Sequence, residues 1–175
     1  LGKSVMNLYP EYELTQEKLV QIGWASSLHD IGKIAISDSI ILKPGKLTPD
    51  EFELIKSHTT KGSEIIQHRI RLNDRAIYEY AYDIARHHHE KYDGKGYPDG
   101  LKGDEISIAA QIVSLVDVYD ALTSKRVYKD AYEPDTAFQM ILNGHSGTFS
   151  PKLLKAFAEV RSEIERLLSM YPDEE

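Results

Sequence analysis

Histidines and aspartates in separate stretches of the chain are the side chains best suited to chemistry. His29 is followed directly by Asp30 at the end of an apolar segment, where an unpartnered charged pair would be costly to bury. Asp117 and Asp120 lie one helical turn apart, and nearly every residue around them is apolar. A carboxylate in such surroundings needs a partner, and a metal ion or an intrahelical salt bridge would provide one.

Other histidines strengthen the metal interpretation. His58 ends a predicted helix, and His87, His88 and His89 are consecutive. Consecutive helical side chains point about 100° apart, so two of these three can face neighbouring ions but all three cannot face one site. Imidazoles and carboxylates without thiols suit Fe, Mn or Zn, and such ligands from several helices favour a two-metal site. For each residue taken alone, a hydrogen-bonded core histidine or a surface cluster is the alternative.

The composition restricts the class of protein. A length of 175 residues suits one domain, and 21 Lys and Arg against 28 Asp and Glu give a net charge of −7, which argues against a surface for nucleic-acid polymers. The absence of Cys excludes disulfides, thiolate metal sites and a cysteine nucleophile. No apolar run approaches the roughly 20 residues of a membrane span, and no secretory signal is visible. A reducing cytoplasm is therefore the expected compartment.

The segments that carry the histidines and aspartates are predicted to be helical almost throughout. Periodic apolar residues and capping residues predict helices over 15–28, 48–58, 61–70, 74–90, 107–123, 133–142 and 150–170. The segment 107–123 is partly β-branched, so a strand competes there, but its length and its alanines favour a helix. We expect one all-α domain built from these helices.

Three details of this prediction concern the surroundings of the histidines. Residues 48–51 carry the Thr, Pro and Glu of a capped helix start, and the helix that follows is expected to turn Phe52, Leu54 and Ile55 inward. The segment 38–47 contains a Lys-Pro-Gly-Lys sequence and is predicted to be a turn rather than an element. Residues 92–103 hold four glycines and one proline, which predicts a long loop, and such loops are more often functional than idle.

Four motifs together resemble the HD-GYP family of the HD phosphohydrolase superfamily. His29-Asp30-Ile31-Gly32-Lys33 is similar to the His-Asp signature of the superfamily. His88-His89-Glu90, followed by Tyr92-Asp93-Gly94-Lys95-Gly96-Tyr97-Pro98-Asp99-Gly100, is similar to the second signature, which names the HD-GYP family. Residues 42–48 and 117–123 also match the family pattern in order and spacing, and the similarity covers about residues 15–160.

This resemblance implies a metal-dependent phosphodiesterase of the HD-GYP type. Such an enzyme hydrolyses the bacterial second messenger cyclic di-GMP to the linear dinucleotide, to GMP or to both, with a metal-activated hydroxide. Two divalent ions are implied, with Fe or Mn favoured and Zn, Ni or Mg as alternatives. Asp30 would bridge the two ions, one of them held further by His58, His88 and His89 and the other by His29 and Asp117.

The resemblance also assigns residues to catalysis and to the substrate. Lys33 matches the catalytic lysine near the scissile phosphate, where it would act beside Asp30. Arg126 and Lys129 match a cationic pair that binds substrate phosphates, for which a solvated surface is the alternative. The loop residues placed beside the site are Gly96, Tyr97 and Pro98, for which a simple tight turn is the alternative.

Two other functions remain open at this point. The domain could be a non-catalytic cyclic di-GMP sensor, or a docking module that contacts signalling proteins through the Gly-Tyr-Pro loop. It could also hydrolyse another cyclic dinucleotide. Family members carry further metal ligands on an upstream helix, and residues 1–14 resemble the tail of that helix and its connection. We therefore expect residues 1–175 to form an HD-GYP domain that lacks its N-terminal helix or helices, that follows a regulatory domain, and that belongs to the bacterial cytoplasm.

Overall fold

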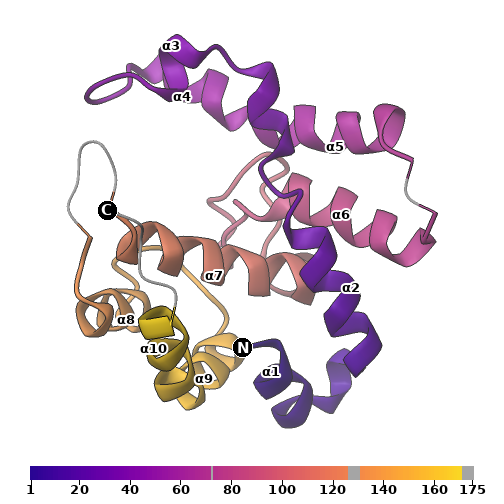
Figure 1. Cartoon of the computed structure of the whole chain (residues 1–175), viewed down its shortest axis with the longest axis vertical. Helices are drawn as coiled ribbons and strands as arrows, with labels where there is room; N and C mark the ends of the chain where they lie inside the picture. The colour runs from indigo at the N-terminus through magenta and orange to yellow at the C-terminus, as the bar shows by residue number, and fades with distance from the viewer. Residues whose placement is uncertain (72, 126–130, 171–175) are drawn as a thin grey trace.

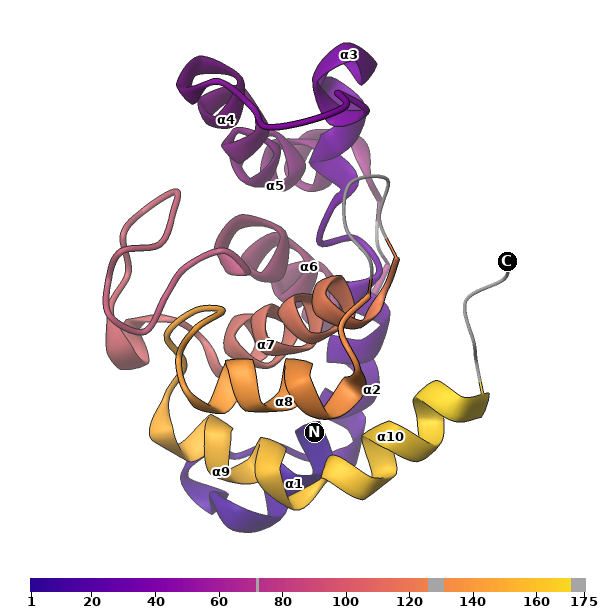
Figure 2. The ribbon, with the colours of Figure 1, turned by 90° about the vertical axis from the view of Figure 1, so that its left-hand side faces the viewer.

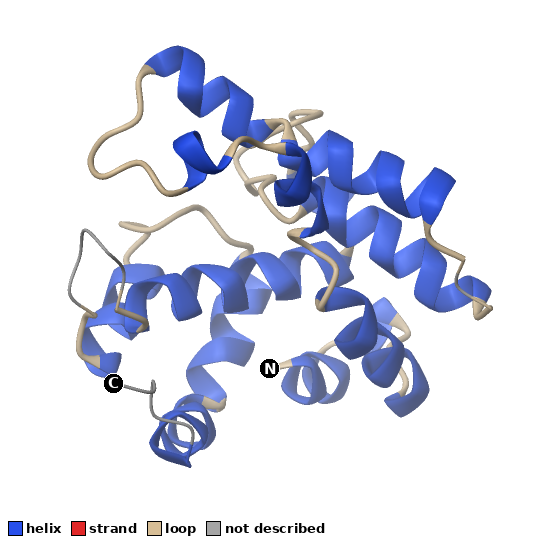
Figure 3. Cartoon of the chain, turned by 45° about the horizontal axis from the view of Figure 1, so that its top comes forward, coloured by secondary structure: helices blue, strands red, loops and turns tan. Residues whose placement is uncertain are grey.

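The chain folds into an all-helical domain in a computed structural model that describes residues 1–71, 73–125 and 131–170. No strand occurs in these residues, as the colouring of Figure 3 shows. The predicted all-α fold is therefore confirmed. Nor does any helix of this described part combine the length and the apolar character that crossing a membrane requires.

Most of the helices are short and joined by brief connections, apart from the long loop between α6 and α7 (Figure 1). They are α1 (Gly2–Leu8), α2 (Gln16–Ser26), α3 (Asp38–Ile41), α4 (Pro49–Lys56), α5 (His58–Arg69), α6 (Arg75–His87), α7 (Ile108–Thr123), α8 (Pro134–Leu142), α9 (Pro151–Glu159) and α10 (Arg161–Met170). Segments of 3-10 helix in the described residues are η1 (Pro10–Tyr12), η2 (Ile31–Ala35) and η3 (Gly103–Glu105). Figure 2 shows α5, α6, α7, α8 and α9 stacked above one another, with the α6–α7 loop extending to one side.

Helix α7 lies at the centre because it contributes to both hydrophobic clusters. Its residues Leu115 and Tyr119 pack with the buried faces of α1, α8 and α9. Its residues Ala109 and Val113 pack with the buried faces of α2, α5 and α6. Burial on nearly every side explains why a segment that also suits a strand is almost continuously apolar. Helix α6 packs against α2, α5 and α7 and therefore fixes these helices relative to one another.

Predicted helix starts are confirmed where a side chain caps them. Thr15 accepts a hydrogen bond from the backbone N–H of Lys18 (3.2 Å). Thr48 and Glu51 form the reciprocal capping box, with Glu51 accepting from the Thr48 N–H (2.7 Å). Each cap satisfies an N–H group that has no partner within its helix. Neighbouring residues therefore determine these helix starts, and the sequence alone can predict them.

Other boundaries differ from the prediction. The segment predicted as a turn over 38–47 begins with the short helix α3. The helix predicted over 48–58 ends at Lys56, and His58 instead begins α5. The helix predicted over 74–90 ends at His87. The helix predicted over 150–170 is divided at Val160, because α10 changes direction there and packs Ile164 against the cluster around α7.

The inward face predicted for α4 is also wrong. Phe52 and Leu54 are 46% and 49% exposed, while Ile55 is half-buried. The reason is that α4 lies at the edge of the molecule, where α3 and α5 are its main neighbours among the helices described. A helix with so little cover leaves part of its apolar face open to solvent.

Gly32 in η2 provides a test of how η2 is positioned against α5. A Cβ atom on Gly32 would lie 1.9 Å from the carbonyl oxygen of His58 and 2.5 Å from the backbone nitrogen of Gly62. We expect Gly32→Ala to lower the free energy of unfolding by about 3 kcal/mol, because backbone on both sides must move. Urea denaturation of the metal-free protein measures this change.

The matched control is Gly23→Ala within α2, where a Cβ atom would have no neighbour within 4 Å. This substitution should raise the free energy of unfolding by about 0.5–1 kcal/mol through helix propensity. Wild-type stability of Gly32→Ala would show that η2 is not packed against α5 as described.

Candidate metal centre

The six side chains expected to bind metal meet at one place. They come from the turn after α2 (His29, Asp30), the first residue of α5 (His58), the two residues that follow α6 (His88, His89) and the middle of α7 (Asp117). The contact between η2 and α5 and the packing of α2 on α6 bring these segments together. The long loop after α6 lies beside them.

Three imidazoles form the buried part of the site. His58, His88 and His89 each offer a ring nitrogen, and these nitrogens lie within 4.8 Å of one another. His58 and His88 are each 1% exposed, and their Nε2 atoms are 3.4 Å apart. The Asp30 Oδ1 atom lies 3.4 Å from Nε2 of His58 and 4.0 Å from Nε2 of His88. One carboxylate oxygen therefore faces the histidine group.

The other oxygen of Asp30 faces a second group. Its Oδ2 lies 3.4 Å from Nε2 of His29, and that nitrogen lies 3.7 Å from Oδ1 of Asp117. Lys33 Nζ also reaches Asp30 Oδ2 at 2.5 Å from one turn further along η2. Asp30 thus lies between a group of three histidines and a group made by His29 and Asp117.

Three of the histidines are held by the ends of helices. The Nδ1 atoms of His29, His58 and His88 lie 2.7, 2.7 and 2.9 Å from the backbone carbonyl oxygens of Ser26, Ile55 and Ile84. These carbonyls belong to the last turns of α2, α4 and α6, where a helix has acceptors without intrahelical partners. A carbonyl can only accept, so Nδ1 carries the proton in each ring and Nε2 is turned toward the site.

The resulting arrangement lacks a positive charge among the buried histidines. Burial lowers the pKa of both His58 and His88, so both rings are neutral and their Nε2 atoms carry lone pairs. Two lone pairs then face each other across 3.4 Å, and the Asp30 Oδ1 atom, also an acceptor, is buried without a hydrogen-bond partner among the described residues. Converging acceptors repel one another unless a cation lies between them. Neutral imidazoles with a carboxylate fit a divalent metal ion.

The second group carries its own positive charge. Asp117 first and Asp30 next raise the pKa of His29 to about 10, so this ring is protonated at neutral pH. Burial raises the pKa of Asp30, but His29 and Lys33 outweigh it and hold that pKa below its ordinary value. Burial likewise raises the pKa of Asp117, and His29 again outweighs it. Two ionised carboxylates here attract a cation, which would displace the proton of His29.

The glycine-rich loop covers one side of the histidines. The ring of Tyr97 packs on the ring of His89, with centroids 4.9 Å apart and planes inclined by 31°. Gly96 is required for this approach, because a Cβ atom there would lie 2.3 Å from the backbone nitrogen of Lys91. Pro98 follows in the same loop, after a cis peptide bond. The predicted loop residues therefore lie at the site.

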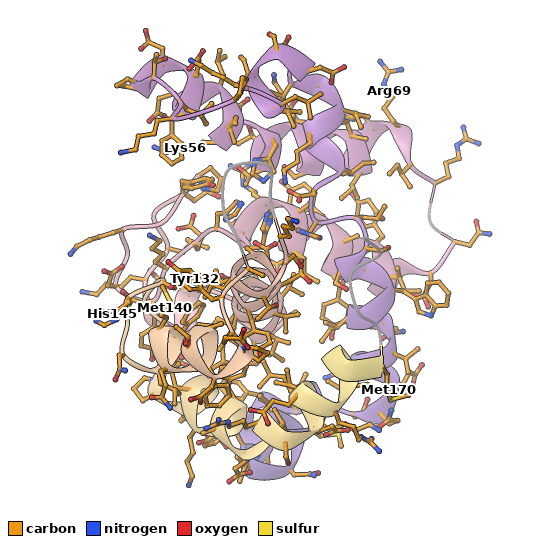
Figure 4. All side chains as sticks on the ribbon, turned by 60° about the vertical axis from the view of Figure 1, so that its left-hand side comes forward. Lys56, Arg69, Tyr132, Met140, His145 and Met170 are labelled. Carbon is orange, nitrogen blue, oxygen red and sulfur yellow. The ribbon has the colours of Figure 1, made fainter. Side chains whose placement is uncertain are left out.

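Lys56 is a neighbour of the site that no sequence motif indicated. Its Nζ atom lies 5.6 Å from the ring centroid of Tyr97 and 4.9 Å from that of Phe52, and Figure 4 shows the residue at the end of α4. The predicted phosphate-binding residues Arg126 and Lys129 lie outside the residues that the structure describes.

An open groove of about 560 Å³ runs from the site between α1, α2, α7 and α10. His29, Asp117 and Asp120 line its end at the site, and Val20 and Val116 are among its apolar walls. Asp120 is exposed, so it does not need the partner that its apolar neighbours in sequence suggested. The groove could not be predicted, because its walls come from helices distant in sequence.

Comparisons with known proteins support the family resemblance. A sequence profile described as HD domain matches residues 3–153. A probable cyclic di-GMP phosphodiesterase of Vibrio cholerae is 43% identical over 153 residues, which is 86% of this chain and 35% of the relative. A cyclic di-GMP phosphodiesterase of Thermotoga maritima is 40% identical over 165 residues, which is 94% of this chain and 44% of the relative.

A further relative is named for a different cyclic dinucleotide substrate. A 3′3′-cGAMP-specific phosphodiesterase of Vibrio cholerae is 38% identical over 162 residues, which is 93% of this chain and 30% of the relative. The chain spans less than half the length of these curated relatives. The profile match covers most of the chain and includes both signatures. On these grounds the chain belongs to the HD domain family, and it is of the HD-GYP type.

Proposed function

We propose that this chain is the catalytic domain of a metal-dependent phosphodiesterase that hydrolyses cyclic di-GMP. The observation that carries the proposal is the set of converging acceptors, in which Nε2 of His58, Nε2 of His88 and Oδ1 of Asp30 face one another without a proton between them. Such a set destabilises a metal-free protein and is suited to hold a cation. The relatives from Vibrio cholerae and Thermotoga maritima are named as cyclic di-GMP phosphodiesterases, which supports cyclic di-GMP as the substrate.

The proposal includes two divalent ions and assigns a ligand set to each. His58, His88 and His89 would hold one ion, His29 and Asp117 would hold the other, and Asp30 would bridge them. The position of Asp30 between the two groups supports this division, because each of its oxygens faces one group. Imidazole and carboxylate ligands without thiols favour Fe or Mn, and they also suit Zn.

The chain's own residues suit phosphodiester hydrolysis. Divalent ions, when bound, activate a water and neutralise charge on the phosphoryl oxygens. Asp30 lies between the two ligand groups and contacts both. Lys33 places a compact cation beside them, which can stabilise the negative charge that develops on the phosphate. Tyr97 shields His89 from solvent on the loop side. Arg126 and Lys129 are proposed to bind the outer phosphates on the grounds of the family resemblance alone.

The groove beside His29 and Asp117 supports a substrate with flat apolar parts. A purine base can pack on walls such as Val20 and Val116 while its phosphate reaches the metal centre. This feature suits cyclic di-GMP and 3′3′-cGAMP equally, since both carry purines. The relative specific for 3′3′-cGAMP therefore keeps that dinucleotide as the second candidate substrate. Signalling partners at the 96–98 loop, an upstream regulatory domain and a cytoplasmic location stay predictions from the resemblance.

The decisive experiment is hydrolysis by the chain after anaerobic loading with Fe²⁺ or Mn²⁺. We expect cyclic di-GMP to give the linear dinucleotide or GMP by chromatography, faster than 3′3′-cGAMP does in a parallel reaction. His58→Ala should remove this activity because a buried imidazole is lost. His145→Ala, which alters an exposed histidine, is the matched control and should retain it.

Each contrary result has a separate meaning. Metal binding with tight dinucleotide binding but no product would indicate a sensor rather than an enzyme. Preferred cleavage of 3′3′-cGAMP would replace the substrate and leave the reaction unchanged. If no divalent metal binds to the wild-type chain, the metal centre itself is wrong.

A further inference from the structure

His87 is the one member of the His87-His88-His89 run that the proposed metal centre does not use. Its ring lies between two carboxylates: Nδ1 is 2.7 Å from Oδ1 of Asp83, and Nε2 is 3.0 Å from Oδ2 of Asp99. Asp83 is one turn earlier on α6, whereas Asp99 belongs to the glycine-rich loop. The side chain of His87 is 16% exposed, and those of Asp83 and Asp99 are 28% and 34% exposed, so the imidazole is largely shielded from water and the carboxylates are partly solvated. His87 therefore joins the end of α6 to the loop.

Three residues hold Asp99: His87, Arg86 and Glu90. Arg86 donates two hydrogen bonds to its carboxylate, from Nε to Oδ2 and from Nη2 to Oδ1, both 2.7 Å long. The backbone N–H of Asp99 donates to Oε1 of Glu90 (2.7 Å), which also accepts from the N–H of Gly100 (3.0 Å). Glu90 is 4% exposed. A bidentate Arg–carboxylate pair beside a buried backbone anchor fixes both the position and the direction of a loop.

The same group of contacts reaches α7. Ser107 donates its hydroxyl hydrogen to Oδ2 of Asp83 and accepts a hydrogen bond from the backbone N–H of Ala110 (3.1 Å). Ser107 is the N-cap of α7, the helix that carries Asp117. The contacts therefore connect the end of α6, the glycine-rich loop and the start of α7.

His89 depends on this loop more than the other histidines do. His29, His58 and His88 are each oriented by a backbone carbonyl, but no carbonyl of the described residues binds a ring nitrogen of His89. Ring packing orients it instead: the centroids of Tyr97, His88 and His58 lie 4.9, 4.1 and 5.0 Å away. Tyr97 precedes Asp99 by two residues, so the fixed position of Asp99 restricts where the Tyr97 ring lies, together with the backbone N–H of Tyr97, which donates to the carbonyl oxygen of His89 (3.3 Å).

We propose that Asp99, held by Arg86 and His87, is a positioning residue that orients His89 through Tyr97. The inference rests on the proposed metal centre and concerns the ion assigned to His58, His88 and His89. Loss of Asp99 frees the loop, the Tyr97 ring leaves His89, and that imidazole no longer faces the ion. Removing an outer group that orients a ligand typically lowers metal affinity 10–100-fold. The ion assigned to His29 and Asp117 has its own contacts and should be unaffected.

The test is a titration of the metal-free chain with Co²⁺, followed by calorimetry and by the visible absorption bands of bound Co²⁺. Wild-type protein should bind two equivalents. In Asp99→Ala one equivalent should bind 10–100-fold more weakly and its absorption spectrum should change, while the other equivalent is retained. Asp104→Ala is the control, because it removes an exposed carboxylate close in sequence to the same loop and should bind both ions like the wild type. Circular dichroism verifies the fold.

A second pair of variants addresses the case in which Asp99→Ala does not fold. Tyr97→Phe keeps the ring and should keep both affinities, whereas Tyr97→Leu removes the packing partner of His89 and should weaken one equivalent as Asp99→Ala does. Wild-type Co²⁺ affinity and spectrum in Asp99→Ala and Tyr97→Leu would overturn the inference while leaving the metal centre intact. Equal weakening of both ions would also overturn it. If the wild-type chain binds no Co²⁺, the metal centre and the inference both fail.

Discussion

Asp30→Asn should abolish tight metal binding and lower the rate of cyclic dinucleotide hydrolysis on the order of 10³-fold or more, yet leave the metal-free fold as stable as before. The carboxylate faces both ligand groups, with Oδ1 toward His58 and Oδ2 toward His29. Its removal would take a negatively charged ligand from each of the two proposed ions, and removing such a group is among the most costly changes to a catalytic site.

The stability of this variant distinguishes a functional carboxylate from a structural one. In the metal-free protein Oδ1 of Asp30 is buried without a hydrogen-bond partner and faces the unprotonated Nε2 of His58. An amide NH₂ group at this position can donate to that nitrogen, which converts a repulsive contact into a hydrogen bond. We therefore expect the free energy of unfolding to stay equal or to rise. A residue needed only for the fold would show the opposite sign.

Two measurements test this prediction together. Metal analysis after anaerobic loading gives the ions bound per chain, and urea denaturation of the metal-free protein gives the free energy of unfolding. Asp104→Asn, which makes the same charge change at an exposed position, should match the wild type in both. A full complement of metal in Asp30→Asn, or a large loss of stability, would contradict the role given to Asp30.

The features that the sequence predicted correctly are those set by neighbouring residues. Thr48 and Glu51 satisfy each other's backbone groups, so the start of α4 needs no information from the rest of the fold. The glycines of residues 92–103 predicted the loop for the same reason, since Gly94 and Gly100 adopt positive φ angles there. The family resemblance supplied the candidate ligands, and the structure places them near one another.

The features that were missed depend on contacts between distant segments. Phe52 and Leu54 have the apolar character of a buried face, but no distant segment covers most of α4. The helix predicted over 150–170 is split at Val160, and its second part, α10, packs Ile164 against the hydrophobic cluster of α1, α7, α8 and α9. A periodic pattern shows which side of a helix is apolar, but it does not show what will pack against that side.

The orientation of three histidines at the metal centre could have been anticipated from the sequence. His29, His58 and His88 each follow the end of a helix closely, and each ring nitrogen Nδ1 donates to a carbonyl three or four residues earlier. Helix ends always have such carbonyls free, so a histidine just beyond a helix is well placed to be oriented. His89 lies equally close to the end of α6, but among the described residues its ring contacts no such carbonyl and is held by ring packing instead, which no sequence pattern indicated.

Lys33→Gln should lower kcat about 10²–10³-fold while the metal content stays at the wild-type level. In the metal-free protein Nζ of Lys33 pairs with Oδ2 of Asp30 at 2.5 Å, and the side chain is 46% exposed. A divalent ion at Asp30 competes for the same oxygen, which leaves the ammonium group available to the phosphate beside it. Preorganised donors of this kind contribute about 10²–10³ in rate when removed singly.

The comparison with other lysine variants makes this expectation specific. Lys155→Gln removes an exposed charge on α9, away from the metal centre, and should retain wild-type kcat. Lys33→Arg should restore little activity, because the planar guanidinium cannot occupy the place of a compact ammonium group. Steady-state rates on cyclic di-GMP and metal analysis of the same samples separate the two roles of Lys33. A loss of bound metal in Lys33→Gln would make it a structural partner of Asp30, and unchanged kcat would remove it from the chemistry altogether.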